Sequence, residues 1–177
     1  MELKDIRVFV CVPGVGKSYL AKIDDRFVDL DDMKARFKYA LEDASVEEME
    51  YLKGNRGKAV REGSTEYMRT LTHKFLNETD KILLFAPNPL MVEMLFNAGI
   101  PYCLVYHSKS CVEEYRQRMK NRGNQDNYIA SMLDPIDEFY EQSVTDERPA
   151  FKIELFEGEY LSDKLLNIFG KNEKEKI

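Results

Sequence analysis

Residues 8–20 read VFVCVPGVGKSYL, a β-branched run that passes through a glycine-containing loop into a helical pattern. The β-branched and aromatic residues within 6–12 predict a buried strand, and residues 18–23 predict the helix that follows it. The loop between them fits the pattern G-x-x-x-x-G-K-[ST], except that Cys11 stands at the first glycine position. This pattern is typical of a loop whose backbone amides cradle phosphate groups.

The later positions of the motif each have their own chemistry. Gly16 lets the backbone turn so that its amides point inward, Lys17 can reach the β- and γ-phosphates of a nucleotide, and Ser18 can ligate Mg²⁺. The first position only closes the turn after the strand, which the small side chain of Cys11 permits. The alternative is a chance GKS in an ordinary strand-turn-helix. We expect an ATP site made of Pro13, Gly14, Val15, Gly16, Lys17 and Ser18.

A second signal is the stretch RFVDLDDMKARF, which begins at Arg26. Asp29 and Asp31 alternate at the end of a predicted strand, so both side chains can point to the same side at its carboxyl edge. Ligands bind at that edge in open α/β sheets. We assign Asp29 to catalysis and to Mg²⁺, and Asp31 to the phosphoryl acceptor. The alternative is that both acids only cap the next helix.

A third signal is the stretch CVEEYRQRMKNRGN at residues 111–124. Arg118 and Arg122 are four residues apart and therefore share one helical face. Arginines in that position can neutralise charge on a transferring phosphoryl group, so we assign both to catalysis. The alternative is a solvated basic face that pairs with Glu113 and Glu114.

The rest of the chain alternates apolar runs with helical periodicities. One helix is expected to have Asn88 as its N-cap, Pro89 as its first residue and Gly99 at its end, and Pro135 is expected to interrupt a later one. Strands separated by helices predict a parallel sheet covered on both faces, an α/β three-layer domain. Further strands are predicted at 26–30, 81–86, 101–106 and 151–156, and further helices at 64–78, 112–119, 126–142 and 161–169.

Composition narrows the classes of function. The 177 residues carry a net charge of −6, which disfavours binding of duplex nucleic acid. No apolar run approaches the roughly 20 residues needed to cross a membrane. The three cysteines contain no CxxC pair, so we expect free thiols and a cytoplasmic location. The strand at 81–86 is followed by no Walker B aspartate, which disfavours a motor ATPase or a switch GTPase.

Together, the phosphate-binding loop, the strand ending in D-x-D and the late arginine-rich helix resemble the nucleoside-monophosphate-kinase-like branch of P-loop kinases. FVDLDDMK is similar to the D-x-D of shikimate-kinase-type enzymes, and IPYCLVYHSKSCVEEYRQRMKNRGN resembles small nucleotide-kinase-like proteins of phage and prophage genomes. The resemblance implies a P-loop NTPase fold with about five parallel strands and ATP as the phosphoryl donor. It also implies one kinase-like domain at 1–170 with a lid near 116–127, followed by a charged tail at 171–177.

The phosphoryl acceptor is left open by the motifs. The adenylate-kinase signature D-G-[FY]-P-R and the glycine-rich substrate stretch of shikimate kinases are both absent. A helical insertion at about 43–69 is the expected acceptor flap, with Arg56 and Arg61 as acceptor-binding residues. We expect an Mg²⁺- and ATP-dependent kinase that acts on a small nucleotide or nucleoside. A polynucleotide 5′-hydroxyl kinase, a non-catalytic nucleotide-binding regulator and a homodimeric state are open alternatives.

Overall fold

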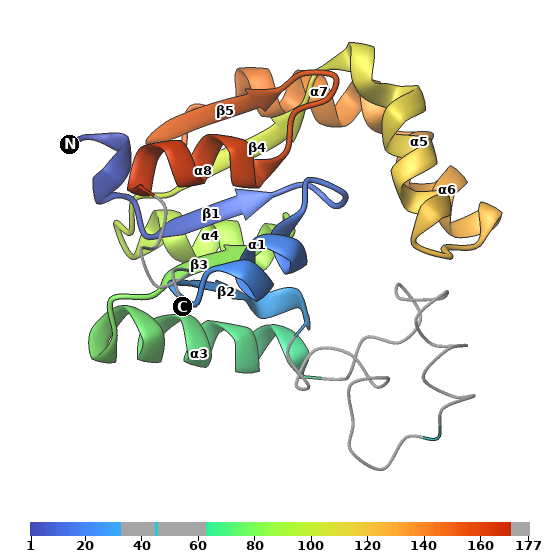
Figure 1. The fold of residues 1–177 in the computed structure, drawn as a ribbon. Coiled ribbons are helices and arrows are strands. Elements are labelled where there is room, and N and C mark those ends of the chain that lie inside the picture. The colour runs from blue at the N-terminus through green and yellow to red at the C-terminus, as the bar shows by residue number, and fades with distance from the viewer. Residues whose placement is uncertain (33–44, 46–62, 171–177) are drawn as a thin grey trace.

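The computed structural model describes residues 1–32, 45 and 63–170, and within them one sheet of five parallel strands has the order β2-β3-β1-β4-β5. Helices flank the sheet, so the predicted α/β three-layer class with five strands is confirmed (Figure 1). The arrangement is compatible with a P-loop NTPase fold. The strands are β1 (Val8–Cys11), β2 (Phe27–Asp29), β3 (Ile82–Phe85), β4 (Cys103–His107) and β5 (Phe151–Leu155).

Seven helices lie in the described part of the chain, and three short 3-10 helices join them. None of these helices is long and apolar enough to cross a membrane. The helices are α1 (Lys17–Ile23), α3 (Ser64–Glu78), α4 (Pro89–Asn97), α5 (Val112–Asn121), α6 (Asp126–Leu133), α7 (Ile136–Thr145) and α8 (Leu161–Phe169), and the 3-10 helices are η1 (Leu3–Asp5), η2 (Leu30–Asp32) and η5 (Lys109–Cys111).

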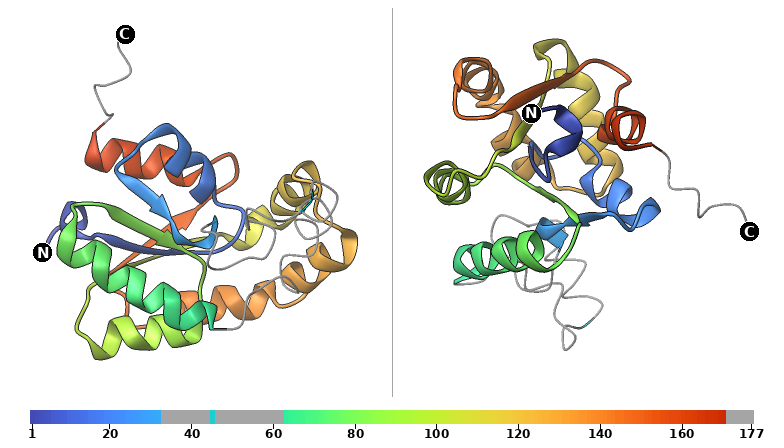
Figure 2. Two further views of the ribbon diagram at one scale, coloured as in Figure 1. Left: turned by 90° about the horizontal axis from the view of Figure 1, so that it is seen from below. Right: turned by 90° about the vertical axis from the view of Figure 1, so that its left-hand side faces the viewer.

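The alternation of side chains along β1 divides the core in two. Phe9 packs with Leu20 of α1 and Leu165 of α8 on one face of the sheet. Val8 and Val10 pack with residues of α3 and α4 on the other face, where α7 also lies (Figure 2). Because successive side chains of a strand point to opposite faces, a continuous apolar run is what a doubly covered strand requires.

Helices α5 and α6 extend beyond the carboxyl ends of the strands (Figure 1). They pack on each other through a small apolar cluster of Tyr115, Met119, Ile129 and Leu133. The residues of the predicted lid, 116–127, correspond to the second half of α5, the turn after it and the start of α6. Its role as a lid stays a prediction.

Local signals in the sequence set several helix ends as expected. Asn88 caps α4, because its side chain accepts hydrogen bonds from the amides of Leu90 and Met91, and Pro89 is the first helical residue. Pro135 separates α6 from α7. The helices predicted at 64–78 and 161–169 match α3 and α8.

Candidate functional site

The loop between β1 and α1 has a backbone that only glycine suits at two positions. Gly14 has φ +88° and Gly16 has φ +99°, both in the left-handed region. A Cβ added to Gly14 would lie 2.1 Å from the Tyr115 ring of α5. Both the backbone conformation and this clash therefore exclude a larger side chain at position 14. Gly16 has more room, since its nearest neighbour would be the Tyr160 ring at 3.6 Å. The two motif glycines are therefore required by geometry.

Cys11 contributes its backbone to this loop and its side chain to the core. It is the last residue of β1 and fully buried, and its carbonyl accepts a hydrogen bond from Nζ of Lys17 at 3.2 Å. Burial is the main cause that raises the pKa of its thiol well above the ordinary value, so the thiol stays protonated at neutral pH. A cysteine in place of the motif's first glycine is thus accommodated without loss of the carbonyl contact.

Four polar side chains meet beside the loop. Oγ of Ser18 donates a hydrogen bond to Oδ2 of Asp29 at 2.7 Å, and Nζ of Lys17 lies 3.3 Å from Oδ2 of Asp31. The side chains of Lys17, Asp29 and Asp31 are all buried, with under a tenth of their surface exposed. Because buried charges require partners, this cluster is a strongly coupled unit.

Backbone amides hold the two carboxylates of the cluster in place. Oδ1 of Asp29 accepts a hydrogen bond from the amide of Asp31 at 3.0 Å. This contact lies in the turn at the start of η2. Oδ2 of Asp31 accepts the amide of Ala86 at 2.7 Å, just after β3. One oxygen of Asp29 therefore does serve a turn, as the capping alternative expects, while the other reaches Ser18. The helix that the acids were expected to cap lies outside the described residues.

The position of a Walker B acid is filled in another way. Ala86 follows β3, the strand next to β1, where that acid would be expected, and it offers only its amide to Asp31. Asp29, at the end of β2 one strand further out, makes the contact with the loop serine. The described residues contain no group of three or more His, Cys, Asp or Glu side chains suited to a metal. These residues fit a Mg²⁺ held by Ser18, phosphate oxygens and water, with Asp29 behind the serine hydroxyl.

The arginines of α5 have different surroundings. Arg118 is nine-tenths buried and donates to Oε1 of Glu114 at 2.5 Å and to the carbonyl of Glu159 at 3.1 Å. Its guanidinium carbon lies 3.8 Å from the centroid of the Tyr160 ring, and Tyr160 neighbours Gly16. Its Nε and Nη1 are buried with no hydrogen-bond partner in the described part of the chain. Arg118 therefore lies close to the phosphate-binding loop.

Arg122 does not share this environment. It is exposed and caps the end of α5, although the four-residue spacing predicted that it lies on the face of Arg118. Glu113 pairs with Arg116 at 3.3 Å, and Glu114 pairs with Arg118, as the alternative of a salt-bridged face expects. The structure thus brings one of the two predicted catalytic arginines to the loop.

The acceptor-binding predictions fall mostly outside the described residues. Arg56 and Arg61 belong to the part of the predicted insertion at 43–69 that the structure does not describe. Its last residues form the start of α3, where Arg69 is exposed and pairs with Glu66 at 3.1 Å. Asp31, which was also predicted to bind the acceptor, is described by the structure and is buried beside Lys17.

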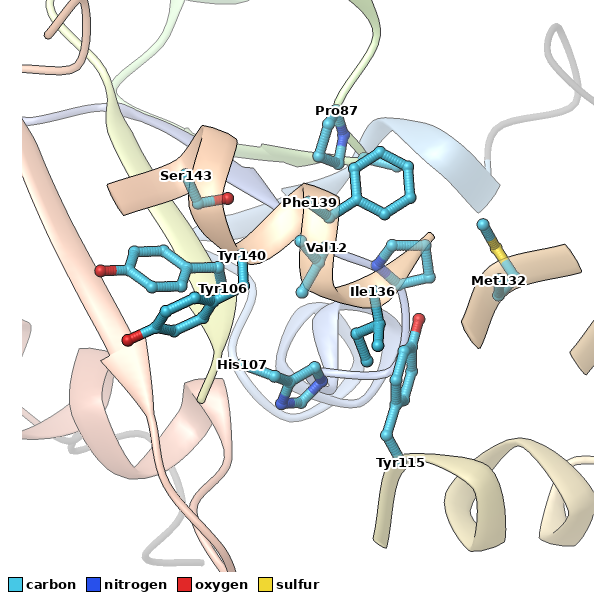
Figure 3. Close-up of a pocket in the computed structure, with 12 residues that line it drawn as sticks. Val12, Pro87, Tyr106, His107, Tyr115, Met132, Ile136, Phe139, Tyr140 and Ser143 are labelled. Carbon is cyan, nitrogen blue, oxygen red and sulfur yellow. The ribbon is translucent and has the colours of Figure 1, made fainter. Parts of the chain in front are cut away.

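Sequence reasoning missed an aromatic and apolar cavity beside the loop. His107, at the end of β4, lies in its wall with its ring 4.7 Å from that of Tyr115. Burial first, and the nearby charge of Arg118 second, lower the pKa of His107 to about 4, so the imidazole is neutral at pH 7. The cavity has a volume of about 120 Å³ and is lined by Val12, Pro13, Ala86, Pro87, Tyr106, His107, Tyr115, Met132, Ile136, Phe139, Tyr140 and Ser143 (Figure 3).

Comparison with models of known protein families and with curated protein sequences found no match to this chain.

Proposed function

We propose that the protein is an Mg²⁺-dependent phosphotransferase that moves the γ-phosphate of ATP to a small acceptor, a nucleotide or nucleoside, in the cytoplasm. The observation that carries this proposal is the cluster of Lys17, Ser18, Asp29 and Asp31 at the end of the glycine loop, in which the lysine and both carboxylates are buried. A strand-turn-helix with a chance GKS would have no reason to bury a lysine and two carboxylates against the loop. Ser18 would hold Mg²⁺, with Asp29 behind its hydroxyl, and the metal would supply positive charge to neutralise the phosphates.

Each residue of the cluster has a role that follows from its contacts. Lys17 moves from Asp31 to the phosphates, which replace the carboxylate as its partner. Ser18 supplies a hydroxyl ligand, and Asp29 orients that hydroxyl through the 2.7 Å hydrogen bond. Asp31, still held by the amide of Ala86, loses its ion pair with Lys17 in this step and serves as the proton acceptor.

The transfer step balances with these groups alone. The acceptor hydroxyl oxygen forms a bond to the γ-phosphorus, while the bond from that phosphorus to the β–γ bridging oxygen breaks. The hydroxyl proton passes to Asp31, and ADP leaves with the bridging oxygen. Arg118 stacks on Tyr160, which neighbours Gly16 of the loop, and would add positive charge near the transferred phosphoryl group.

A nucleotide-binding regulator is the alternative from another class, and a transfer assay separates the two. We would incubate γ-labelled ATP and Mg²⁺ with nucleosides, nucleoside monophosphates, short DNA 5′ ends and sugar acids. The wild type should label at least one acceptor, and Lys17→Ala should lose about 10²–10³-fold in rate because a phosphate clamp is removed. Lys22→Ala, on the exposed side of α1, is the matched control and should keep full activity. Binding of ATP with no transfer to any acceptor would favour the regulator.

A further inference from the structure

The cavity adjoins the proposed site of chemistry. Val12 and Pro13 of the phosphate-binding loop form one side of it, and Ala86, whose amide binds Asp31 at 2.7 Å, forms another. Figure 3 shows α7 contributing Phe139 and Tyr140 across from the loop. A molecule in the cavity therefore lies against the residue whose amide binds the carboxylate that we propose as the proton acceptor.

The walls of the cavity are neutral. None of the twelve described residues that line it carries a charge at pH 7, since His107 is kept uncharged by burial. Four aromatic side chains, those of Tyr106, Tyr115, Phe139 and Tyr140, supply most of a surface suited to a flat ring. Transfer of a phosphate group from water into this cavity would be costly in free energy, because no cationic side chain among the lining residues would pair with it.

The size of the cavity selects a single ring. Its volume of about 120 Å³ is close to that of an engineered apolar cavity of about 150 Å³ that binds benzene. One six-membered ring is therefore close to the size of the cavity, and a fused two-ring system would extend beyond it towards solvent. Nε2 of His107 is buried without a hydrogen-bond partner in the described part of the chain, so it offers a polar group to a ring that carries polar atoms.

The neighbouring acids favour an alcohol over a phosphate as the reacting group. Asp29 and Asp31 lie beside the cavity's Ala86 side, and two carboxylates repel a second phosphate dianion. A neutral hydroxyl is not repelled, and it needs a proton acceptor to become a good nucleophile. Charge and proton chemistry thus point to the same kind of acceptor.

We infer that this cavity binds the ring of the phosphoryl acceptor, and that the acceptor is an uncharged single-ring alcohol of the pyrimidine-nucleoside class. The inference rests on the proposed kinase function for its reaction: the nucleoside hydroxyl takes the γ-phosphoryl group of ATP, its proton goes to Asp31, and ADP leaves. The cavity itself needs no turnover to bind the nucleoside. Binding can therefore be tested apart from catalysis.

The experiment measures binding of uridine and thymidine, of their 5′-monophosphates and of adenosine by titration calorimetry, without ATP. It is repeated with Phe139→Arg, which places a cation in the cavity at a residue that is already 44% exposed. Phe96→Arg is the matched control, because Phe96 is 56% exposed on α4 and lies outside the cavity. Thermal melts verify that both variants fold.

We expect the pyrimidine nucleosides to bind at least tenfold more tightly than their monophosphates and than adenosine. Phe139→Arg should weaken nucleoside binding at least tenfold, and Phe96→Arg should leave it unchanged. Equal or tighter binding of the monophosphates or of adenosine overturns the inference, as does folded Phe139→Arg with unchanged nucleoside affinity.

The transfer assay separates this inference from the proposed function. If the nucleosides bind as expected but accept no phosphate from ATP, the cavity assignment stands and the kinase proposal fails. If transfer that depends on Lys17 occurs to another acceptor while no pyrimidine nucleoside binds, the kinase proposal stands and the inference fails.

Discussion

The two sides of the phosphate-binding loop differ sharply in chemistry. On one side Lys17, Ser18, Asp29 and Asp31 form a polar cluster with a buried lysine and two buried carboxylates, and the contacts described above each involve a charge or a hydroxyl. On the other side the loop borders an aromatic cavity whose one titratable imidazole, His107, is held neutral. Charged side chains are thus concentrated in the cluster where phosphates would bind. The neutral cavity beside it is where the ring of an acceptor would bind.

The largest effect should come from the polar side. Asp31→Asn should lower the transfer rate by about 10²–10⁴-fold with ATP affinity retained, because the proposed proton acceptor is lost. Asp29→Asn should instead shift the Mg²⁺ dependence of turnover, because the partner of Ser18 loses its charge. Steady-state kinetics at several Mg²⁺ concentrations measure both effects.

A control variant completes that comparison. Asp80→Asn, in an exposed position before β3, should change neither quantity. If Asp29 and Asp31 act only as caps, asparagine would cap nearly as well, and both variants would keep full turnover. That result would remove the acid pair from the mechanism.

The next prediction concerns how His107, in the cavity wall, makes the stability of the protein depend on pH. The pKa of His107 is lowered to about 4 by burial first and by Arg118 second, with Glu114 opposing and Lys17 adding a smaller lowering. In the unfolded chain the His107 imidazole is protonated near its ordinary pKa of 6.5. Its contribution to the free energy of unfolding is therefore complete above about pH 6.5 and is lost as pH falls towards 4. The loss should reach about 3 kcal/mol, at 1.36 kcal/mol for each pKa unit.

Urea denaturation between pH 7 and pH 4 measures this loss. His107→Gln should flatten the dependence, whereas His73→Gln, on the exposed side of α3, should leave it as in the wild type. An unchanged slope in His107→Gln would mean that burial does not lower the pKa of the imidazole in the folded protein, which would contradict its placement in an apolar wall.

A smaller effect tests the contact that joins the loop to α5. Gly14→Ala should destabilise the protein by about 2 kcal/mol and weaken ATP binding, because a Cβ meets the Tyr115 ring and the backbone has φ +88°. Gly123→Ala is the matched control, since it has φ +75° but nothing within 4 Å of an added Cβ, and should cost about 1 kcal/mol without loss of ATP affinity. Equal effects of both variants in thermal melts and ATP titrations would show that the contact with Tyr115 is unimportant.

Local signals made much of the fold predictable. The cap of Asn88, the proline at position 89 and the break at Pro135 act within a few residues, so the sequence could reveal them. Asp29 ends β2 as predicted, but Asp31 lies in the 3-10 helix η2, so strand alternation accounts for the position of Asp29 alone. Neither observation required knowledge of which strands are neighbours.

What the sequence could not reveal depends on long-range packing. The pairing of Asp31 with the amide of Ala86 joins residues 55 positions apart and requires β2 to lie next to β3. The burial of Arg118 against Tyr160 requires α5 to meet the turn before α8. Helical periodicity alone put Arg118 and Arg122 together, because it says nothing of what covers each turn of a helix.

The most direct test of the account is the affinity for ATP of the wild type and of Ser18→Ala, each measured by calorimetry with excess Mg²⁺ and with EDTA. The account predicts that Mg²⁺ tightens ATP binding to the wild type, and that Ser18→Ala loses this enhancement while it binds ATP in EDTA as the wild type does. That pattern follows because Ser18 is the proposed metal ligand and Asp29 its partner at 2.7 Å. The same Mg²⁺ enhancement in both proteins, or no ATP binding by either, would contradict the account.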